Sequence, residues 1–226
     1  MWLRPASSVW RRMLGCVNHE TLDVIHADDS LVVVDKPAGL LAVPGKPREG
    51  EAAPANLFAQ VQRRFPDAAI AHRLDMATSG LMLFARGAAM QRALSIAFEQ
   101  RRVNKRYVAI VEGTLAGTSG EIEAPLAADW PARPRQKVDA ERGRPSLTRW
   151  WSLGAADDGA TRVLLEPVTG RTHQLRVHLL HIGHRIVGDA LYGAEPQARL
   201  MLHATVLELL HPLTGEALAF ESLPPF

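Results

Sequence analysis

The stretch HRLDMATSGLMLFA (72–85) joins a polar segment without regular period to a short apolar run. The run LMLFA (81–85) is continuous and short, which is typical of a buried strand. The preceding HRLDMATSG (72–80) ends in small hydroxyl residues and a glycine, which favour a tight turn. Asp75 therefore lies in a loop held by a regular element, and such a position suits a catalytic carboxylate. Taken alone, the segment is more typical of a structural turn with a local ion pair.

Apolar runs bounded by Pro or Gly predict more strands than helices along the rest of the chain. Helical spacing is found at 57–65, behind a capping Asn56, and at 88–100 and 172–181, before Gly183. Because strands and helices do not alternate regularly, we expect an α+β fold with a mostly antiparallel, mixed sheet and flanking helices. The expected strands lie at 31–35, 81–85, 106–113, 148–153, 161–167, 202–209 and 216–223, the last two as a hairpin.

The segment 125–149 interrupts this pattern with four prolines and a cluster of basic residues. It predicts an ordered insertion or a hairpin whose Arg133, Arg135 and Lys137 would follow a phosphate backbone. A solvated charged face explains the same cluster equally well. The net charge of +2 does not decide between the two, since many enzymes are mildly basic.

A second polar segment, PVTGRTHQLRVHLLHIGHRIVGD (167–189), contains an expected helix entry. Gly170 and Arg171 lie where backbone N–H groups and a guanidinium can bind phosphate. Leu175 and Arg176 follow within the helix. The histidines at 173, 178, 181 and 184 suggest a metal site, but no Cys or acidic residue lies among them and no zinc spacing is matched. We therefore expect no metal, and assign these histidines to RNA contact, stacking or core hydrogen bonds.

Tyr107 follows Lys105 and Arg106 directly in the chain. An aromatic ring beside basic residues can stack on a base while its neighbours bind phosphates. A half-buried tyrosine at the edge of a sheet is the other interpretation, and the residue alone does not separate the two.

Composition limits the class of protein. The 226 residues are 47% hydrophobic, and Cys16 is the single cysteine, so no internal disulfide can form. Apolar runs are all too short for a membrane helix, so we expect no membrane association. Residues 1–19 lack acids and contain three arginines, which fits either an organellar transit peptide or a disordered start. We treat 1–21 as a disordered extension.

Four segments, in this order, resemble the RluA-type pseudouridine synthases. They are DKPAGLLAVPG (35–45), HRLDMATSG (72–80), NKRYVAIVEG (104–113) and TGRTHQLRVH (169–178). The resemblance extends from Leu22 nearly to the last residue. The stretch PLAADWPARPRQKV (125–138) also resembles the dual-specificity members, which act on 23S ribosomal RNA and on tRNA anticodon loops. Arg185 departs from the family pattern, in which proline is common at this position.

The resemblance implies a pseudouridine synthase catalytic domain over 22–226 that isomerises uridine in RNA without any cofactor. Asp75 would be the catalytic carboxylate and Arg176 its charged partner. Tyr107 would stack on the uracil, and Leu175 would pack against the other side of the ring. The target base would be flipped out of the RNA, with Arg73 filling the space that it leaves.

Further expectations concern the substrate. The resemblance implies 23S rRNA, a tRNA anticodon stem-loop, or both as partners. Only about 20 residues precede the first family segment, so we expect no S4 RNA-binding domain. A cytoplasmic monomer is the default expectation. The residues expected to contact RNA besides Arg73 and Leu175 are Arg171, His173, Gln174, Arg133, Arg135 and Lys137.

Two other functions fit parts of the pattern. A non-catalytic RNA-binding protein would need neither Asp75 nor Arg176, and both are present. A glycosidase-like hydrolase would need paired carboxylates, and no second acid follows Asp75 closely in the sequence.

Overall fold

The computed structural model describes residues 21–46, 52–195 and 197–226. The expected N-terminal extension, apart from residue 21, lies outside the described residues, as does Cys16. The middle of the loop expected over 40–54 also lies outside them. No helix among the described residues has both the length and the apolar character that crossing a membrane would require.

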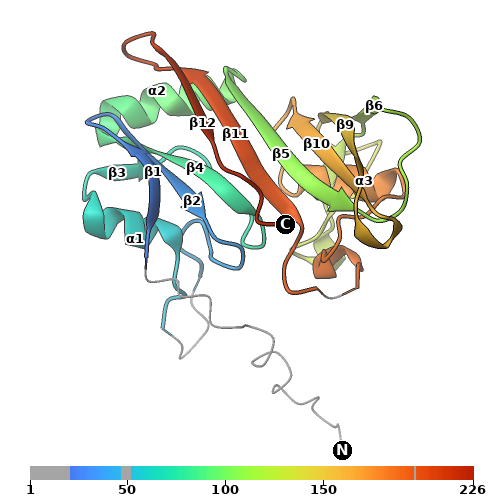
Figure 1. Ribbon diagram of the computed structural model, residues 1–226. Coiled ribbons are helices and arrows are strands. Elements are labelled where there is room, and N and C mark those ends of the chain that lie inside the picture. Colours follow the sequence, from blue (N-terminus) through green and yellow to red (C-terminus); the bar gives the residue numbers. More distant parts are fainter. Residues whose placement is uncertain (1–20, 47–51, 196) are drawn as a thin grey trace, which may run out of the picture.

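A ten-stranded sheet forms the centre of the fold (Figure 1). Its main path runs β1-β2-β4-β11-β5-β10-β9-β6, with β12 paired to β11 and β3 paired to β4. All strand pairs are antiparallel except β4 and β11, which run parallel. The strands are β1 (Asp23–Ala27), β2 (Leu31–Lys36), β3 (Ala68–Ile70), β4 (Ser79–Arg86), β5 (Val103–Val111), β6 (Ser119–Glu123), β9 (Leu147–Ala155), β10 (Thr161–Pro167), β11 (Leu202–Leu210) and β12 (Ala217–Glu221).

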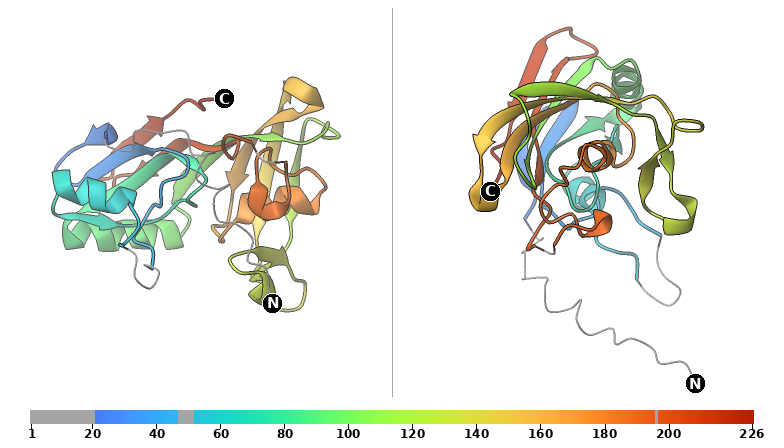
Figure 2. Two further views of the ribbon diagram at one scale, coloured as in Figure 1. Left: turned by 90° about the horizontal axis from the view of Figure 1, so that it is seen from below. Right: turned by 90° about the vertical axis from the view of Figure 1, so that its right-hand side faces the viewer.

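Three α-helices flank this sheet (Figure 2), and the first two of them pack against opposite faces of β2 and β4. They are α1 (Leu57–Arg64), α2 (Gly87–Glu99) and α3 (Gln174–His181). Asn56 caps α1 through a side-chain hydrogen bond from the Ala59 N–H, as its position in the sequence predicted. The mixed α+β architecture is thus confirmed.

The basic segment is a separate hairpin, with β7 (Leu126–Ala128) paired to β8 (Gln136–Val138). A short 3-10 turn at Trp130–Ala132 lies between the two strands. The hairpin interpretation of residues 125–149 is therefore confirmed. The hairpin packs near α3, and the side chains of Leu126, Val177 and Tyr192 form a small apolar cluster between them.

Several element boundaries differ from the sequence prediction. The last helix begins at Gln174 and not at 172, because His173 adopts a left-handed backbone with φ 55°. Strands β1, β3 and β6 were not predicted. In β1, exposed and partly buried residues alternate, and in β6 only Ile122 is buried. Strands at a sheet edge bury too little apolar surface to give a continuous hydrophobic run.

The sheet has apolar clusters along its whole length, and they meet at its centre. One cluster lies between α1 and one face of β2 and β4, and a second lies between α2 and the opposite face of the same strands. A third cluster fills the half of the fold formed by β5, β10 and α3. Tyr107 on β5 packs against two of these clusters. The centre of the sheet is therefore where residues from both halves of the chain come together.

The parallel contact of β4 with β11 requires a very close approach at Gly80. This residue has φ +106°, and a Cβ atom there would lie 2.3 Å from the backbone oxygen of Ala204. Only glycine tolerates both the backbone conformation and the contact. The contact also positions the loop that precedes β4, which carries Asp75.

We predict that Gly80→Ala is much more destabilising than Gly87→Ala. Gly87 also has a positive φ of +75°, but nothing lies within 4 Å of its Cβ position. The Gly87 variant should lose roughly 1–2 kcal/mol of unfolding free energy from backbone strain alone. The Gly80 variant should lose roughly 1–3 kcal/mol more from the clash. Urea denaturation of both variants measures this difference, and equal losses would contradict the close contact.

Candidate active site

Asp75 lies in the loop that enters β4, and one partly buried and one fully buried side chain hold this loop. The Nε2 of His72 accepts a hydrogen bond from the Leu83 N–H at 2.9 Å, which ties the loop to β4. Burial, with a smaller effect of the Lys105 charge, lowers the pKa of His72 to about 3, so the ring is neutral and able to accept. The Gly39 N–H donates to the Met76 carbonyl oxygen at 2.8 Å.

Lys36 is the second anchor and is completely buried. Its Nζ donates to the carbonyl oxygens of Pro37, Leu40 and Met76 at 2.8, 2.8 and 3.0 Å. Burial lowers its pKa to about 7, against the opposing effect of the nearby Asp75 charge. The lysine thereby fixes the residue next to Asp75 to the turn that follows β2.

Arg176 on α3 connects two carboxylates. Its Nε and Nη2 donate to the two oxygens of Asp189, both at 2.7 Å, and its Nη1 donates to Asp75 Oδ2 at 3.2 Å. The Arg176 side chain is 6% exposed, that of Asp189 is 2% exposed and that of Asp75 is 26% exposed. Burial alone would lower the pKa of Arg176, but Asp189 and Asp75 together raise it. Asp75 is therefore the carboxylate that remains accessible.

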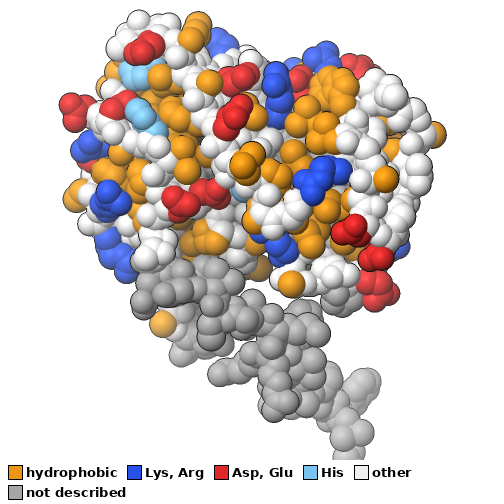
Figure 3. All heavy atoms as spheres, viewed as in Figure 1, with side chains coloured by type: hydrophobic (Ala, Val, Ile, Leu, Met, Phe, Trp, Pro, Cys, Tyr) orange, Lys and Arg blue, Asp and Glu red, His pale blue; other side chains and the backbone are white. Residues whose placement is uncertain are grey.

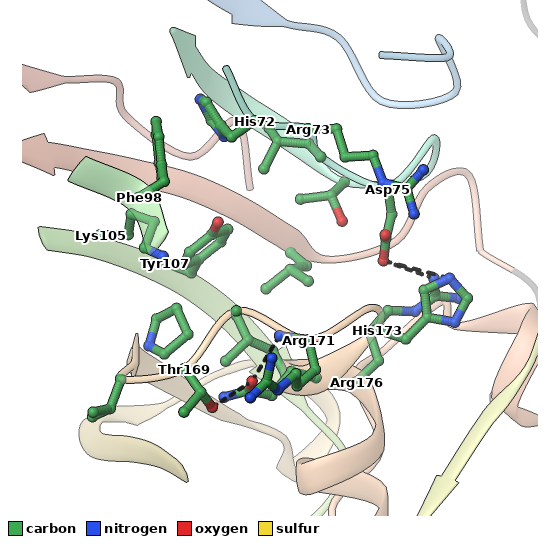
Figure 4. A pocket seen from close by; sticks show the side chains of 18 of the residues that line it. His72, Arg73, Asp75, Phe98, Lys105, Tyr107, Thr169, Arg171, His173 and Arg176 are labelled. Atoms are coloured by element: carbon green, nitrogen blue, oxygen red, sulfur yellow. Dashed lines mark hydrogen bonds and ion pairs between the residues drawn. The ribbon is translucent and has the colours of Figure 1, made fainter. Parts of the chain in front are cut away.

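The loop before α3 is held by Gln174. Its Oε1 accepts from the Thr169 hydroxyl at 2.7 Å and from the Arg171 N–H at 3.0 Å. Its Nε2 donates to Leu147 O and to Thr148 Oγ1. The Gln174 amide thus forms its hydrogen bonds within the protein. These bonds hold the loop so that Arg171 lines the cavity beside Asp75 (Figure 4).

This first cavity has a volume of about 480 Å³ and brings together Asp75, Tyr107, Leu175 and Arg176. The four residues come from the β4 entry loop, from β5 and from α3 (Figure 4). Burial, reinforced by the Asp75 charge, raises the pKa of Tyr107, so its hydroxyl stays protonated at neutral pH. The size lies within the usual range of ligand pockets.

One wall of the cavity combines aromatic rings with positive charge. His72 stacks on Phe98 with ring centroids 4.5 Å apart, and Lys105 Nζ lies 5.9 Å from the Phe98 centroid. Burial lowers the pKa of Lys105. The basic residues that line the cavity are Arg73, Arg101, Lys105, Arg171 and Arg176, against the acids Asp75 and Glu99. Such a surplus of positive charge favours a phosphate-bearing ligand.

A second cavity of about 860 Å³ adjoins the first and shares Arg73, Asp75, His173 and Arg176 with it. The basic hairpin forms its far side through Arg133, whose guanidinium lies 3.4 Å from the ring centroid of the exposed Trp130. The other two predicted RNA contacts on the hairpin, Arg135 and Lys137, line neither of these two cavities. Arg135 lies over the Tyr192 ring, and Lys137 pairs with Asp139.

The four histidines of the second polar segment do not converge. His173 contacts Tyr192, His178 contacts Thr148 and the Ala124 carbonyl, and His184 contacts the Glu112 carbonyl. Among the described residues, no group of three or more His, Cys, Asp or Glu side chains is placed to hold a metal ion.

The face of the molecule seen in Figure 1 has a mixed surface. Figure 3 shows acidic and basic side chains interspersed among hydrophobic ones on the face seen in Figure 1. That face lacks the continuous positive stripe that is typical of nucleic-acid-binding surfaces.

Sequence reasoning missed three residues of the site: Lys36, Asp189 and Tyr192. Each contacts a residue at least 13 positions away in the chain, and each is 4% exposed or less. Lys36 stands in a quoted family segment, but a lysine in a turn usually indicates a solvated charge. Only its complete burial reveals its role.

The sequence profile of the RNA pseudouridylate synthase family matches residues 30–181. The chain belongs to this family. Among its relatives is the dual-specificity RNA pseudouridine synthase RluA of Pasteurella multocida, which is 46% identical over 211 residues, covering 91% of this chain and 94% of the relative. The protein of the same name from Haemophilus influenzae is 44% identical over 211 residues, with the same coverage of both chains.

A solved structure supports the same assignment. Human RNA pseudouridylate synthase domain containing 1 superimposes with a TM-score of 0.75 at 31% identity, covering 92% of this chain and 85% of that one. The resemblance noted from the four sequence segments is therefore confirmed.

The Lys36 anchor leads to a pH-dependent prediction. Because the pKa of Lys36 is lowered to about 7 in the folded protein from about 10.5, the folded state binds fewer protons than the unfolded chain between these two values. The contribution of Lys36 to stability is therefore least favourable below pH 7 and improves as the pH rises through this window. We expect Lys36→Met to lose this improvement.

Guanidinium chloride denaturation of the wild type and of Lys36→Met at pH 7 and at pH 9.5 tests this prediction. The wild type should gain more unfolding free energy than the variant on going to the higher pH. Parallel pH dependence in the two proteins would contradict it.

Proposed function

We propose that the protein converts specific uridines of RNA into pseudouridines. The observation that carries the proposal is the meeting of Asp75, Tyr107, Leu175 and Arg176 in one cavity, in a member of the RNA pseudouridylate synthase family. These residues come from distant parts of the chain, and in the proposal each of them would have a distinct place around one base.

In the proposed reaction the bond from the ribose to the uracil ring nitrogen breaks, the uracil turns, and a ring carbon bonds to the same ribose. The ring carbon loses its proton and the released ring nitrogen gains one, so the product is an isomer of the substrate and no electrons are gained or lost overall. Asp75 acts either by attacking the sugar or by removing a proton beside the bond. Its accessibility, with 26% of the side chain exposed, fits either step.

Arg176 would orient Asp75 through a charge-assisted hydrogen bond. Asp189 in turn fixes the guanidinium with two hydrogen bonds, so that the remaining Nη1 points to Asp75. Tyr107 would stack on one side of the uracil and Leu175 would pack against the other. Since the Tyr107 hydroxyl is held protonated, it is suited to donate a hydrogen bond or to take part in the last proton transfer.

The base has to leave its stack in folded RNA to enter the cavity, which costs a few kcal/mol. We propose that Arg73 fills the vacated space, because it is exposed and lines both cavities beside Asp75. Arg171 and Lys105 would bind the backbone phosphates next to the flipped nucleotide. His173 and Gln174 would contribute by shaping the same edge, and Arg133, Arg135 and Lys137 would contact the RNA from the hairpin.

The substrates that we propose are 23S rRNA and tRNA anticodon stem-loops. This follows from the similarity to relatives named dual-specificity RNA pseudouridine synthases, which reaches across the hairpin. We propose residues 22–226 as the catalytic domain, acting as a monomer in the cytoplasm without metal or cofactor.

Hydrolysis of the sugar–base bond is the alternative reaction. A second acid, Asp189, does lie near Asp75 in space, on the other side of Arg176. It is not free to act as a general acid, since it is 2% exposed and both of its oxygens are bound to the guanidinium. Isomerisation with a single accessible carboxylate is therefore favoured.

We predict that Asp75→Asn abolishes product formation, because the amide has nearly the shape of the carboxylate but cannot attack or accept a proton in its place. Pseudouridine is mapped by carbodiimide treatment and primer extension in total RNA from cells whose only copy is the wild type or the variant. Sites lost with the variant are the substrates.

Either of two results would contradict the proposal, one from this mapping and one from an assay of the purified protein for released uracil. If no site differs between the two strains, the protein is not a pseudouridine synthase for cellular RNA. If purified wild-type protein releases free uracil from RNA, it is a hydrolase. Asp67→Asn is the matched control, since Asp67 is partly exposed and pairs with Arg86 outside the cavities.

A second prediction concerns Arg73→Ala. We expect this variant to bind and convert substrate RNA less well, because the flipped state loses the side chain that fills the gap, while Asp75 keeps its contacts. Rates measured over a range of enzyme concentrations give the change in apparent affinity. Arg92→Ala removes an exposed arginine from α2 and serves as the control. Turnover by Arg73→Ala equal to that of the control would rule out the role.

A further inference from the structure

Tyr192 lies close to Asp75 but belongs to no part of the mechanism above. It ends the short turn Ala190–Tyr192, directly after Asp189, and is 4% exposed. Its hydroxyl lies 2.8 Å from the backbone nitrogen of Gln136 on β8 and 2.8 Å from Nδ1 of His173. One hydroxyl therefore joins the basic hairpin to the residue that precedes α3.

These contacts favour one placement of the protons. The Gln136 N–H can only donate, so the Tyr192 oxygen accepts from it. Among the described residues, His173 Nδ1 is the one acceptor within reach of the Tyr192 O–H. The arrangement that satisfies both groups directs the hydroxyl proton to Nδ1 and leaves this ring nitrogen without a proton of its own.

His173 then has its own proton on the other ring nitrogen. Burial lowers the pKa of His173, despite the opposing charge of Asp75, so the imidazole is neutral near pH 7. A neutral ring with an unprotonated Nδ1 bears its proton on Nε2. That atom lies 3.7 Å from Asp75 Oδ2, and the His173 side chain is 10% exposed.

The ring of Tyr192 is fixed as firmly as its hydroxyl. It meets the His173 ring edge-on, with centroids 5.7 Å apart and an angle of 88°. The guanidinium of Arg176 lies 5.1 Å from the Tyr192 centroid, and that of Arg135, on the hairpin, lies 5.3 Å from it. Contacts from the hairpin, from α3 and from the loop before α3 thus converge on one side chain.

We propose that Tyr192 is a positioning residue that holds His173 in the Nε2–H form, so that the imidazole presents an N–H group to the Asp75 carboxylate. The inference rests on the proposed function, and it extends that function to a residue and a contact beyond the cavity. Because the Gln136 N–H anchors the Tyr192 hydroxyl, the orientation of Asp75 becomes linked to the seating of the β7–β8 hairpin.

The distance of 3.7 Å is too long for a hydrogen bond in the free protein. Contacts of catalytic groups commonly shorten when substrate binds. RNA bound against both the hairpin and the first cavity would contact both ends of the series of side-chain contacts from Gln136 through Tyr192 and His173 to Asp75. Such binding would bring His173 Nε2 closer to the Asp75 carboxylate. Only an RNA that binds the β7–β8 hairpin and holds it in place would then align the Asp75 carboxylate fully. This requirement would contribute to substrate selection.

The tautomer is tested directly by ¹⁵N NMR of protein labelled at histidine, at a pH where His173 is neutral. The shifts distinguish protonated from unprotonated ring nitrogens, and His173→Gln identifies the signals. We expect a protonated Nε2 and an unprotonated Nδ1 in the wild type, and a shift towards protonated Nδ1 in Tyr192→Phe. A protonated Nδ1 in the wild type would overturn the inference.

The kinetic consequence is tested by single-turnover rates at saturating enzyme, with the Kd for the same RNA measured in parallel. Tyr192→Phe should lower the rate about tenfold, equivalent to roughly 1.4 kcal/mol, and leave the Kd nearly unchanged. Thr161→Val is the matched control, because it removes another buried hydroxyl hydrogen bond, to the Gly113 carbonyl, far from the cavities. An unchanged rate in Tyr192→Phe, or an equal loss in Thr161→Val, would overturn the role.

Two further variants keep the test decisive if Tyr192→Phe does not fold. His173→Gln retains an N–H donor near the position of Nε2 and should keep more of the rate than His173→Leu, which has none. Equal rates in these two variants would contradict the inference. If the wild type forms no pseudouridine, the proposed function fails, whereas the tautomer is read on the free protein and stands or falls separately.

Discussion

The guanidinium of Arg176 between Asp75 and Asp189 is the interaction on which the site depends. A buried positive charge is tolerated only when its N–H groups are paired, and Asp189 satisfies two of them with bonds of 2.7 Å. This leaves Nη1 directed at Asp75 and makes one carboxylate structural and the other available. The loop before α3 is fixed in place, because both the oxygen and the nitrogen of the Gln174 amide form hydrogen bonds to it or to residues next to it.

The second constraint is the parallel contact of β4 with β11 in an otherwise antiparallel sheet. It places the N-terminal strands beside the C-terminal ones, so that Asp75 from one half faces Tyr107 and Arg176 from the other. The contact is possible only because Gly80 lacks a side chain against the backbone of Ala204. A fold with these two halves further apart would keep every motif and lose the cavity.

The electrostatics of the site follow from the same arrangement. Basic side chains line two adjoining cavities, and Asp75 lies where the cavities meet. The larger cavity reaches the hairpin, where Arg133 and Trp130 stack at an exposed tip. In the proposed reaction the two adjoining cavities would hold the flipped base and its neighbouring nucleotides, and Tyr192 connects the two regions through its hydroxyl and its ring.

The sequence by itself determined the fold class, the buried strands and the helices, because these depend on local periodicity and on capping groups such as Asn56. It also identified Asp75, Tyr107, Leu175 and Arg176 as a set, through four segments in family order. Only the tertiary structure showed the edge strands, the parallel pair and the partners of the catalytic candidates. The roles of Lys36, Asp189 and Tyr192 depend on contacts with residues far away in the chain. Local periodicity does not predict which buried side chains come into contact in the folded protein.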